Sequence, residues 1–234
     1  MTRRIERHAS LPSTNSRCFQ LGEEGAPAGT VVLAETQTAG RGRRGRAWLD
    51  GGGDLLFSLL LRPQLSLQRA PLVTLAAGVG LAEVTGHRLK WPNDLVTDEE
   101  PPRKLAGILA ELSTQGTQVD FVVLGVGVNV TGAPEVGHGH LQAAALGEVD
   151  RERLLNILVL AIEGRVRQLE RDPLRLTQAW RERAHTLGRR VRIGSIEGVA
   201  VDLREDGALI VETQRGPEAV LAGDVEMVQA HEQG

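Results

Sequence analysis

The sequence predicts an α+β fold built from two units, and two features of the chain carry that prediction. Segments with strand character and segments with helical character are interspersed through residues 1–187. From Gly188 onward the chain consists of short β-branched segments separated by glycine-containing turns, a pattern typical of a small antiparallel barrel or sandwich. A chain of 234 residues, 41% of them hydrophobic, has enough apolar side chains for one large and one small core. We therefore expect two domains, residues 1–187 and residues 188–234.

The first part of the chain is expected to alternate between helix and strand. Ser13 is a favourable N-cap, so residues 14–22 are predicted to form a short helix. Residues 30–35 are rich in β-branched side chains and predict a strand. Residues 48–49 are expected to pair with residues 55–61 across the glycine-rich turn between them, forming a hairpin.

The remainder of the large unit is expected to begin with a buried helix. Residues 71–85 carry the small and apolar side chains of such a helix, with a proline near its first turn. Three strands and then two helices with apolar residues at helical spacing are expected to follow, the strands at residues 88–91, 105–112 and 119–130 and the helices at residues 150–170 and 173–187.

Composition and charge exclude several classes of protein. The net charge of −3 provides no overall positive field for binding DNA or a membrane surface. No segment approaches the roughly 20 consecutive apolar residues of a membrane span, and no apolar run follows the basic N-terminus as in a signal peptide. The single cysteine, Cys18, cannot form an internal disulfide, which suits a reducing compartment. We expect a soluble, cytoplasmic, globular protein that binds neither DNA nor a membrane. Its oligomeric state stays open, a homodimer included.

Lysine is rare in this chain, and its positions are informative. Of the 27 basic residues, the lysines are Lys90 and Lys104, which lie in one short stretch. Arginine is a planar, permanently charged fork, whereas lysine is a compact ammonium group that can sit beside a reacting oxygen. Two of the three tryptophans, Trp48 and Trp91, occur in the same part of the sequence. Codon bias would explain the lysines alone, but their neighbours favour a functional site here.

The segment G-R-G-R-R-G-R-A-W at residues 40–48 combines glycines with four arginines. Glycine allows the backbone to come close to a ligand, and arginine supplies forked donors for phosphate or carboxylate. Because the like charges repel, we expect this loop to be mobile without a ligand and to become ordered around an anion, as a lid does. Trp48 at its end could stack on a nucleobase. A solvated basic turn and a simple nucleic-acid contact are the alternatives.

A second segment, K-W-P-N-D-L, starts at Lys90. Pro92 cannot continue a strand, so Asn93 and Asp94 are expected at a strand end, where sites are commonly built. Asp94 could hold Mg²⁺ or receive a proton there. The alternative is a turn with an incidental ion pair between Lys90 and Asp94.

Two apolar segments also carry polar residues at their ends. In K-L-A-G-I-L-A-E, Lys104 begins a predicted strand, and Gly107 within it indicates close approach of a backbone or a ligand. The segment V-V-L-G-V-G-V-N-V ends at Asn129 and Val130, and the Asn129 amide could contact a nucleotide or a metal-bound water. This segment matches neither a dinucleotide fingerprint nor a Walker A loop.

Together, G-R-G-R-x-G-R-x-W, K-W-P-N-D-L and K-L-A-G-I-L-x-E, in this order, resemble the biotin protein ligases, and the resemblance extends from Ser13 to the C-terminus. It implies a mixed-sheet α+β catalytic domain with flanking helices, followed by a small SH3-like β-barrel. It also implies biotin and ATP as substrates with Mg²⁺. The biotin carboxylate attacks the α-phosphate of ATP, giving biotinyl-5′-AMP and pyrophosphate. A lysine of a biotin carboxyl carrier protein, such as a subunit of acetyl-CoA carboxylase, then displaces AMP.

The resemblance also implies roles for individual residues. Lys104, Arg43 and Asp94 are expected to be catalytic, with Lys104 poised between the carboxylate and the α-phosphate. Arg46 is expected to grip phosphate and Trp48 to lie against adenine. The residues expected to contact biotin are Ser13, Thr14, Asn15, Gln37, Gly40, Arg41, Arg43, Lys104 and Gly107. Those expected to contact the nucleotide are Arg43, Arg44, Arg46, Trp48, Lys90, Asn93, Lys104 and Asn129. The metal is expected to arrive with ATP, and the candidate protein ligands for it are Asn129 and Asp94.

The sequence departs from the family pattern in two places. Ser13 lies so near the N-terminus that no winged-helix DNA-binding domain fits before it, so no repressor function is expected. Residues 96–103, between Asp94 and Lys104, form a longer stretch than the resemblance implies.

Two other functions compete with this interpretation. A lipoate ligase or octanoyl transferase shares the catalytic fold by resemblance, but a purely apolar acyl chain would leave groups such as Gln37 unpaired. A nucleic-acid-binding module that uses residues 40–46 is the second competitor. With three phenylalanines and no tyrosine, the chain offers few stacking platforms for it.

Several remaining residues are expected to be structural. His138 and His140 lie in G-H-G-H with no further metal ligand close in sequence, so a solvated loop is expected there and not a metal site. Glu111 is expected to be a strand-end charge, Cys18 a small core residue and Trp180 part of the helix packing. The C-terminal unit is expected to have a supporting role.

Overall fold

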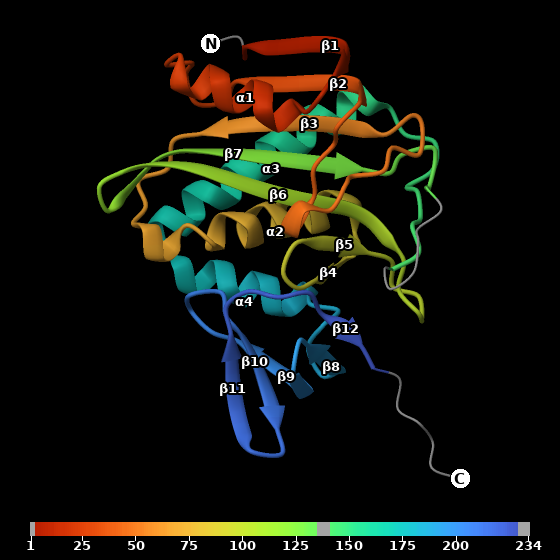
Figure 1. The fold of residues 1–234 in the computed structure, drawn as a ribbon, viewed down its shortest axis with the longest axis vertical. Coiled ribbons are helices and arrows are strands. Elements are labelled where there is room, and N and C mark those ends of the chain that lie inside the picture. The colour runs from red at the N-terminus through yellow and green to blue at the C-terminus, as the bar shows by residue number, and fades with distance from the viewer. Residues whose placement is uncertain (1–2, 135–140, 229–234) are drawn as a thin grey trace.

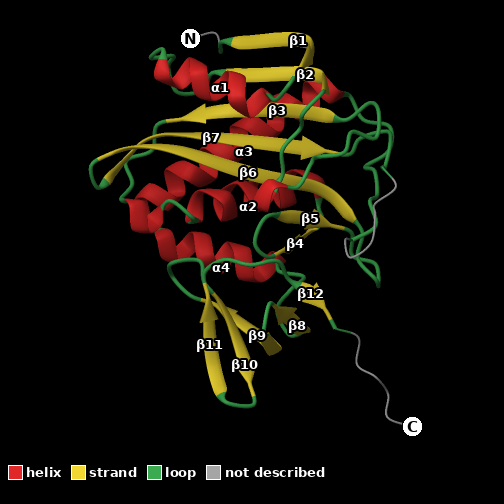
Figure 2. Ribbon diagram, in the orientation of Figure 1, coloured by secondary structure: helices red, strands yellow, loops and turns green. Residues whose placement is uncertain are grey.

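The structure, a computed structural model, describes residues 3–134 and 141–228. A seven-stranded sheet lies against helices, and a second, five-stranded sheet lies beside it at the C-terminal end of the molecule (Figures 1 and 2). The first sheet has the order β1-β2-β3-β7-β6-β5-β4, in which β1 and β2 are parallel and the other pairs are antiparallel. The expected mixed α+β class is therefore confirmed. The strands of this sheet are β1 (Ile5–Leu11), β2 (Val31–Gln37), β3 (Leu55–Leu61), β4 (Arg88–Lys90), β5 (Asp94–Val96), β6 (Lys104–Gln115) and β7 (Gln118–Val128).

The middle of this sheet is buried on both faces because helices cover both sides. On one face α2 and α3 pack in a large apolar cluster that contains Phe57 of β3. On the other face α1 packs against Leu60 of β3 and Phe121 of β7 in a smaller cluster. Successive strand residues point to opposite faces, so β3, which is apolar except for Ser58, supplies both clusters. The helices are α1 (Thr14–Glu23), α2 (Leu72–Thr85), α3 (Arg151–Arg171) and α4 (Pro173–Arg183). Within the described residues, no helix is long and apolar enough to span a membrane.

Most of the expected elements are confirmed, but the expected hairpin is wrong. Residues 55–61 form β3, which pairs with β2 and β7. Residues 48–50 belong to no strand. Trp48 gives the physical reason. Its ring packs against glycines of β6 and β7, so the backbone around it does not run as a strand beside β3. The last long helix, α4, also ends at Arg183 and not at residue 187.

Two strands lack a clear signal in the sequence. The edge strand β1 reads I-E-R-H-A-S-L and is only partly buried, so its side chains do not alternate cleanly between apolar and polar. The three-residue strand β5 follows directly on the turn at Pro92 and pairs with β4 and β6. Asp94, one of the residues expected in the site, is the first residue of β5.

The C-terminal strands form one five-stranded sheet. Its order is β11-β10-β9-β8-β12, all antiparallel, and among the described residues no pairing joins β11 to β12. The SH3-like barrel is therefore not confirmed, and the strands form an open sheet. Trp91 ties this sheet to the first one, since its buried indole Nε1 donates to the Gly207 carbonyl oxygen at 3.0 Å. The strands are β8 (Arg190–Ile193), β9 (Ile196–Leu203), β10 (Leu209–Thr213), β11 (Gly216–Val220) and β12 (Glu226–Met227).

Asp54, just before β3, makes the stability of this fold depend on pH. Its side chain is buried, Oδ2 accepts from the Gly51 amide at 3.1 Å, and Oδ1 has no hydrogen-bond partner. Burial, with a smaller contribution from Asp50, raises the pKa of Asp54 from 3.8 to about 6. Between these two values the folded chain holds a proton that the unfolded chain has lost, so stability falls as pH rises through this window.

Asp54→Asn should therefore flatten the loss of stability between pH 4 and pH 6 and raise the melting temperature at pH 7, because the amide carries no charge to bury. Thermal unfolding followed by circular dichroism at half-unit pH steps measures both effects. Asp50→Asn removes only the smaller contribution to the raised pKa and should flatten the profile in part. The exposed Glu205→Gln is the matched control. Identical pH profiles for wild type and Asp54→Asn would contradict this role of Asp54.

Candidate active site

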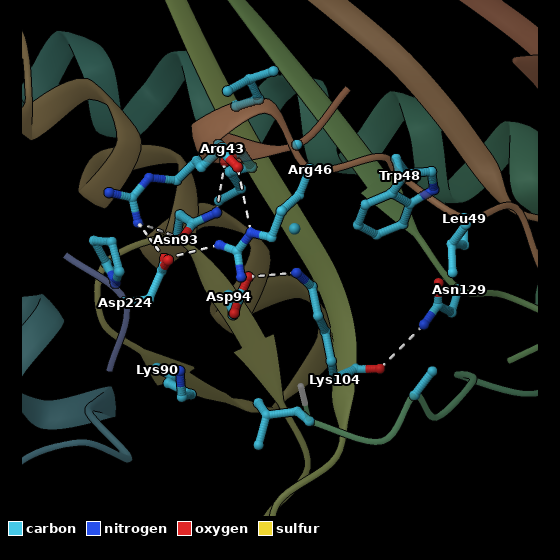
Figure 3. A pocket seen from close by; sticks show the side chains of 18 of the residues that line it. Arg43, Arg46, Trp48, Leu49, Lys90, Asn93, Asp94, Lys104, Asn129 and Asp224 are labelled. Carbon is cyan, nitrogen blue, oxygen red and sulfur yellow. Dashed lines mark hydrogen bonds and ion pairs between the residues drawn. The ribbon is translucent and has the colours of Figure 1, made fainter. Parts of the chain in front are cut away.

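A cavity of about 1180 Å³ lies between the first half of β6, the C-terminal end of β7, the start of α1, the Arg-rich loop (residues 40–48), the β4–β5 turn and residues 224–228. Figure 3 labels ten of its lining residues, which come from several of these segments. Of the residues expected in the site, those that line the cavity are Ser13, Thr14, Asn15, Gln37, Arg41, Arg43, Arg46, Trp48, Lys90, Asn93, Asp94, Lys104, Gly107 and Asn129. Gly40 and Arg44 do not line it. Arg44 has left-handed backbone angles (φ 56°), and its side chain is 63% exposed.

The Arg-rich loop is closed on itself by backbone hydrogen bonds. The Gly42 amide donates to the Arg46 carbonyl oxygen at 2.7 Å, and the Trp48 amide donates to the Gly40 carbonyl oxygen at 2.9 Å. The Arg43 guanidinium reaches the Asn93 side-chain oxygen at 3.2 Å. The loop and the β4–β5 turn, which are remote in sequence, therefore share one wall of the cavity.

Asp224, in the turn before β12, also belongs to the site and was not anticipated from the sequence. Its carboxylate lies 2.8 Å from Nη2 of Arg46 and 3.8 Å from Nη1 of Arg43 (Figure 3). It also lies 3.5 Å from Nη1 of Arg44. One negative charge among three positive ones offsets their repulsion. The expectation drawn from the sequence considered the repulsion among the loop arginines and did not include this carboxylate. The segment A-G-D-V around Asp224 carries no recognisable motif, and only the tertiary contact reveals it.

The contact with Asp224 allows a sharper prediction about the mobility of the Arg-rich loop. In Asp224→Ala the amides of residues 40–46 should exchange hydrogen faster than in wild type, because the repulsion among the arginines is no longer offset. Bound biotin and ATP should protect the loop in both proteins, since anionic groups of the ligands take the place of the carboxylate. Hydrogen exchange read by mass spectrometry measures this, with the exposed neighbour Glu226→Ala as control. Equal exchange of wild type and Asp224→Ala without ligand would contradict it.

Lys104 and Asp94 meet at the centre of the cavity. Lys104 Nζ lies 2.7 Å from Asp94 Oδ1, so the long stretch at residues 96–103 does not separate them. They stay together because β5 and β6, on either side of that stretch, pair with each other. Lys90 is the residue opposite Asp94 in the β4–β5 ladder and is buried. Asp94 therefore forms its ion pair with Lys104. The alternative considered from the sequence was an ion pair with Lys90.

Electrostatics keep Asp94 ionised despite its burial. Burial by itself raises the pKa of Asp94, but the charges of Lys104, Lys90 and Arg46 together outweigh it and hold the pKa below its usual range. Burial lowers the pKa of Lys90, and the nearby Asp94 charge opposes that shift. At neutral pH the centre of the cavity therefore contains one carboxylate surrounded by several cations, a net positive environment suited to anionic ligands.

Trp48 lies against the floor of the cavity, where glycines on two strands make room for its ring. A Cβ at Gly127 would come within 2.6 Å of the indole, and one at Gly107 within 2.8 Å. The ring centroid is also 5.4 Å from Lys104 Nζ. The close approach indicated by Gly107 in the sequence is thus made by Trp48 and Lys104. The indole Nε1 is buried without a hydrogen-bond partner.

Asn129 follows β7, on the same side of the cavity as Trp48 and Leu49 (Figure 3). Its Nδ2 donates to the carbonyl oxygens of Lys104 at 3.1 Å and Ala144 at 3.0 Å. These two contacts fix the orientation of the amide, because both partners can only accept. The Oδ1 atom is buried and has no hydrogen-bond partner, so it is left as an acceptor at the cavity wall.

The opposite end of the cavity is polar and largely uncharged. Ser13, Thr14 and Asn15 at the start of α1 are buried there, and the Gln37 Oε1 atom accepts from the Thr14 amide at 2.7 Å. Glu111 was expected to be only a strand-end charge, but it accepts from Asn15 Nδ2 at 2.7 Å and from Arg41 Nη2 at 2.8 Å.

The other residues singled out in the sequence do not join the site. Cys18 is fully buried, and burial raises the pKa of its thiol to about 12, which fits the expected core residue. Trp180 is buried in the helix packing as expected. His138 and His140 lie outside the described residues. Among the residues that are described, no cluster of three or more His, Cys, Asp or Glu side chains is placed to hold a metal ion.

Sequence comparison identifies the class of protein to which this fold and cavity belong. The family of biotin/lipoate A/B protein ligases matches residues 8–129, and the biotin protein ligase C-terminal domain matches residues 186–228. The matched regions contain nearly all of the cavity lining, including both the Arg-rich loop and Asp224. The fold and site are thus those of a ligase of the biotin/lipoate class.

Individual relatives narrow this class. Proteins named biotin--[acetyl-CoA-carboxylase] ligase from Paracoccus denitrificans and Mycobacterium tuberculosis are 34% and 35% identical, covering 93% and 95% of this chain and 98% and 88% of their own length. The biotin protein ligase of Aquifex aeolicus, solved in complex with biotin and ATP, has a TM-score of 0.78 at 29% identity and covers 98% of this chain and 100% of that one. The chain belongs to the biotin protein ligase family.

Proposed function

We propose that this protein activates biotin with ATP and transfers it to a lysine of a carrier protein. In the first step the biotin carboxylate attacks the α-phosphate of ATP, forming biotinyl-5′-AMP and releasing pyrophosphate. In the second step the lysine amine attacks the biotinyl carbonyl carbon, forming an amide and releasing AMP. The observation that carries the proposal is the Lys104–Asp94 pair, which lies between a polar end of one cavity and its Trp48 wall.

The two substrates of the first step are both anions, and the cavity supplies the charges that bring them together. Lys104 would stand between the carboxylate and the α-phosphate, with Asp94 holding its ammonium group in place. Arg43 and Arg46 would contact phosphate oxygens, and Asn93 positions Arg43. Holding both substrates in reactive geometry contributes about 7–11 kcal/mol to such a step, and electrostatic stabilisation adds to it.

Biotin would occupy the polar end and ATP the Trp48 side. Ser13, Thr14 and Gln37 line the polar end and would hold the ureido ring, with the Arg41 segment closing over it. Asn15 and Gly107 also line this part of the cavity, whereas Gly40, which was expected to contact biotin, does not. On the nucleotide side Trp48 would lie against adenine, with Lys90 and Asn129 beside it, whereas Arg44 does not line the cavity. A water-free cavity would also protect the mixed anhydride from hydrolysis.

Mg²⁺ would arrive with ATP, and the two candidate ligands differ in how well they fit it. Asn129 presents a buried Oδ1 without a partner, which can accept from a metal-bound water. Asp94 is already paired with Lys104 and lies near Lys90, so a further cation beside it would be repelled. We favour Asn129. A bound Mg²⁺ would screen the triphosphate charge.

The remaining parts of the proposal concern partner and organisation. Relatives named biotin--[acetyl-CoA-carboxylase] ligase support a carboxyl carrier subunit of that enzyme as the acceptor. We propose that residues 1–187 form the catalytic domain and residues 188–234 a C-terminal domain that also contributes Asp224 to the site. The lone, buried Cys18 supports a location in the reducing cytoplasm.

Pyrophosphate release by the purified protein tests the proposal directly. Biotin, lipoate and octanoate are supplied in turn with MgATP, and release is expected with biotin. Release only with lipoate or octanoate would assign the protein to the lipoyl branch of the class. No release with any of the three acids would contradict the adenylation step. Incorporation of biotin into a purified carrier domain then tests the transfer step.

A further inference from the structure

The polar end of the cavity is built on a buried chain of hydrogen bonds that continues beyond the residues lining it. Glu111 Oε2 accepts from Asn15 Nδ2 at 2.7 Å, Asn15 Oδ1 lies 2.6 Å from Ser58 Oγ, and Ser58 Oγ lies 2.8 Å from Thr14 Oγ1. Ser58 is fully buried on β3, and neither it nor Glu111 lines the cavity. Ser58 can therefore influence a ligand only through Asn15 and Thr14, and Glu111 only through Asn15 and Arg41.

The direction of each hydrogen bond follows from the chemistry of the groups. The Asn15 Nδ2 atom faces the Leu109 carbonyl oxygen at 3.3 Å as well as the Glu111 carboxylate, and both of these groups only accept. The amide is therefore oriented with Oδ1 toward Ser58. Since an amide oxygen cannot donate, the single hydroxyl proton of Ser58 must be directed to Asn15.

Thr14 is then left with no proton for a ligand. Its hydroxyl can be directed to Ser58 Oγ, which needs a donor because its own proton is committed, or to Gln37 Oε1 at 3.1 Å. In either arrangement the Thr14 proton points into the protein, and only oxygen lone pairs face the cavity. A ligand acceptor placed there would force lone pairs together, or break a buried hydrogen bond.

We propose that Glu111, Asn15 and Ser58 are positioning residues that commit the Thr14 hydroxyl proton to the protein, so that this end of the cavity selects a ligand group that donates an N–H. The inference rests on the proposed function, in which that group is a ureido N–H of biotin. It also gives Asn15 a different role from the direct contact expected for it, because both ends of its amide are used by the protein.

Close packing keeps this chain in register. A Cβ at Gly125 of β7 would lie 2.1 Å from Asn15 Oδ1, so only glycine leaves room for the amide in this orientation. Glu111 also holds Arg41 at 2.8 Å, which links the Arg-rich loop to the same group that orients Asn15. The Glu111 carboxylate thus both holds the Arg-rich loop and fixes the direction of the hydrogen bonds at this end of the cavity.

The test compares biotin with its two cyclic carbamate analogues, in each of which one ureido N–H is replaced by a ring oxygen. Binding to the full chain is measured by calorimetry. Wild type should bind the analogue with oxygen facing Thr14 at least about tenfold more weakly than biotin. In Ser58→Ala the Thr14 proton can turn to the ligand oxygen, so the ratio of the two dissociation constants should fall by about tenfold.

Asn15→Leu removes a different hydrogen bond of the same chain. It should lower the ratio of the two dissociation constants by a similar factor, because the Ser58 hydroxyl is then free to donate to Thr14 Oγ1. The double variant should lower it no further than either single variant, since one chain is broken only once. Ser113→Ala, on β6 and outside the cavity lining, is the matched control and should keep the wild-type ratio. Thermal melting identifies any variant that fails to fold, and the other single variant then carries the test.

Three results would overturn the inference in distinguishable ways. If wild type binds biotin and both analogues equally, or if both variants weaken the binding of all ligands by the same factor, the chain of hydrogen bonds does not fix the direction of the Thr14 hydroxyl. The proposed function is then untouched. If wild type does not bind biotin at all, the proposed function fails, and with it the inference that this chain selects a ureido group.

Discussion

Lys104→Ala is expected to lower the rate of pyrophosphate release from MgATP and biotin by at least about 10²–10³-fold, the cost of removing one fixed donor to a developing negative charge. The structure gives the reason, since Lys104 is the cation at the centre of the cavity and its ammonium group is held by Asp94 at 2.7 Å. Lys104→Arg should be nearly as poor, because a planar guanidinium cannot take the place of a compact charge between two oxygens. Single-turnover kinetics with saturating substrates measure the effect.

The controls separate chemistry from folding. Lys104→Ala leaves the Asp94 carboxylate buried without its partner, which by itself destabilises the fold. Adding Asp94→Asn should restore the melting temperature but not the rate. Arg103→Ala removes a neighbouring cation that pairs with Glu99 outside the cavity lining, and it should keep the wild-type rate. Near-normal pyrophosphate release by Lys104→Ala would remove Lys104 from its proposed role.

The second large effect is expected at Gly127. In Gly127→Ala the new Cβ would come within 2.6 Å of the Trp48 ring, which also lies against Gly107 and cannot shift in that direction. The ring must move into the space proposed for the nucleotide, so the KM for ATP should rise at least about tenfold, with a smaller change in the dissociation constant of biotin. Initial-rate kinetics over ATP concentration and calorimetry with biotin measure the two quantities.

A double-mutant cycle tests whether Trp48 transmits this effect. In a Trp48→Ala background the Gly127→Ala change should add little, because the clashing ring is gone. Gly164→Ala on α3, where a Cβ would meet nothing within 4 Å, should leave the KM for ATP unchanged. If the effects of Gly127→Ala and Trp48→Ala are additive, the clash with Trp48 is not the cause.

The site could be predicted from sequence as far as its motifs reach. The chemistry of the Arg-rich loop, of Lys90 to Asp94 and of Lys104 can be inferred from residue type and spacing, and most of these residues line one cavity. Asp224, Ser58 and the contacts of Glu111 could not be inferred. Their partners are separated by long stretches of chain, 178 residues for Arg46 and Asp224 and 96 for Asn15 and Glu111, and the residues themselves carry no local pattern.

The fold shows the same division. Hydrophobic periodicity and capping residues are local, so the sequence by itself determined the main helices, the strands β2, β3, β6 and β7, and the change to an all-β texture after residue 187. Pairing was not determined in this way. β3 was expected to pair back on residues 48–49, but it lies between β2 and β7, which together satisfy the backbone hydrogen-bonding groups along both edges of this buried strand.

Pairing with other strands explains why some elements were not predicted from the sequence. The edge strand β1 and the short strand β5 are stabilised by hydrogen bonds to neighbouring strands, so their own residues carry little signal. The same is true of charge. The sequence determined that four arginines lie together in residues 40–48, but only the tertiary structure decided that Asp224 offsets their repulsion, because Coulomb energy depends on distance in space and not on separation along the chain.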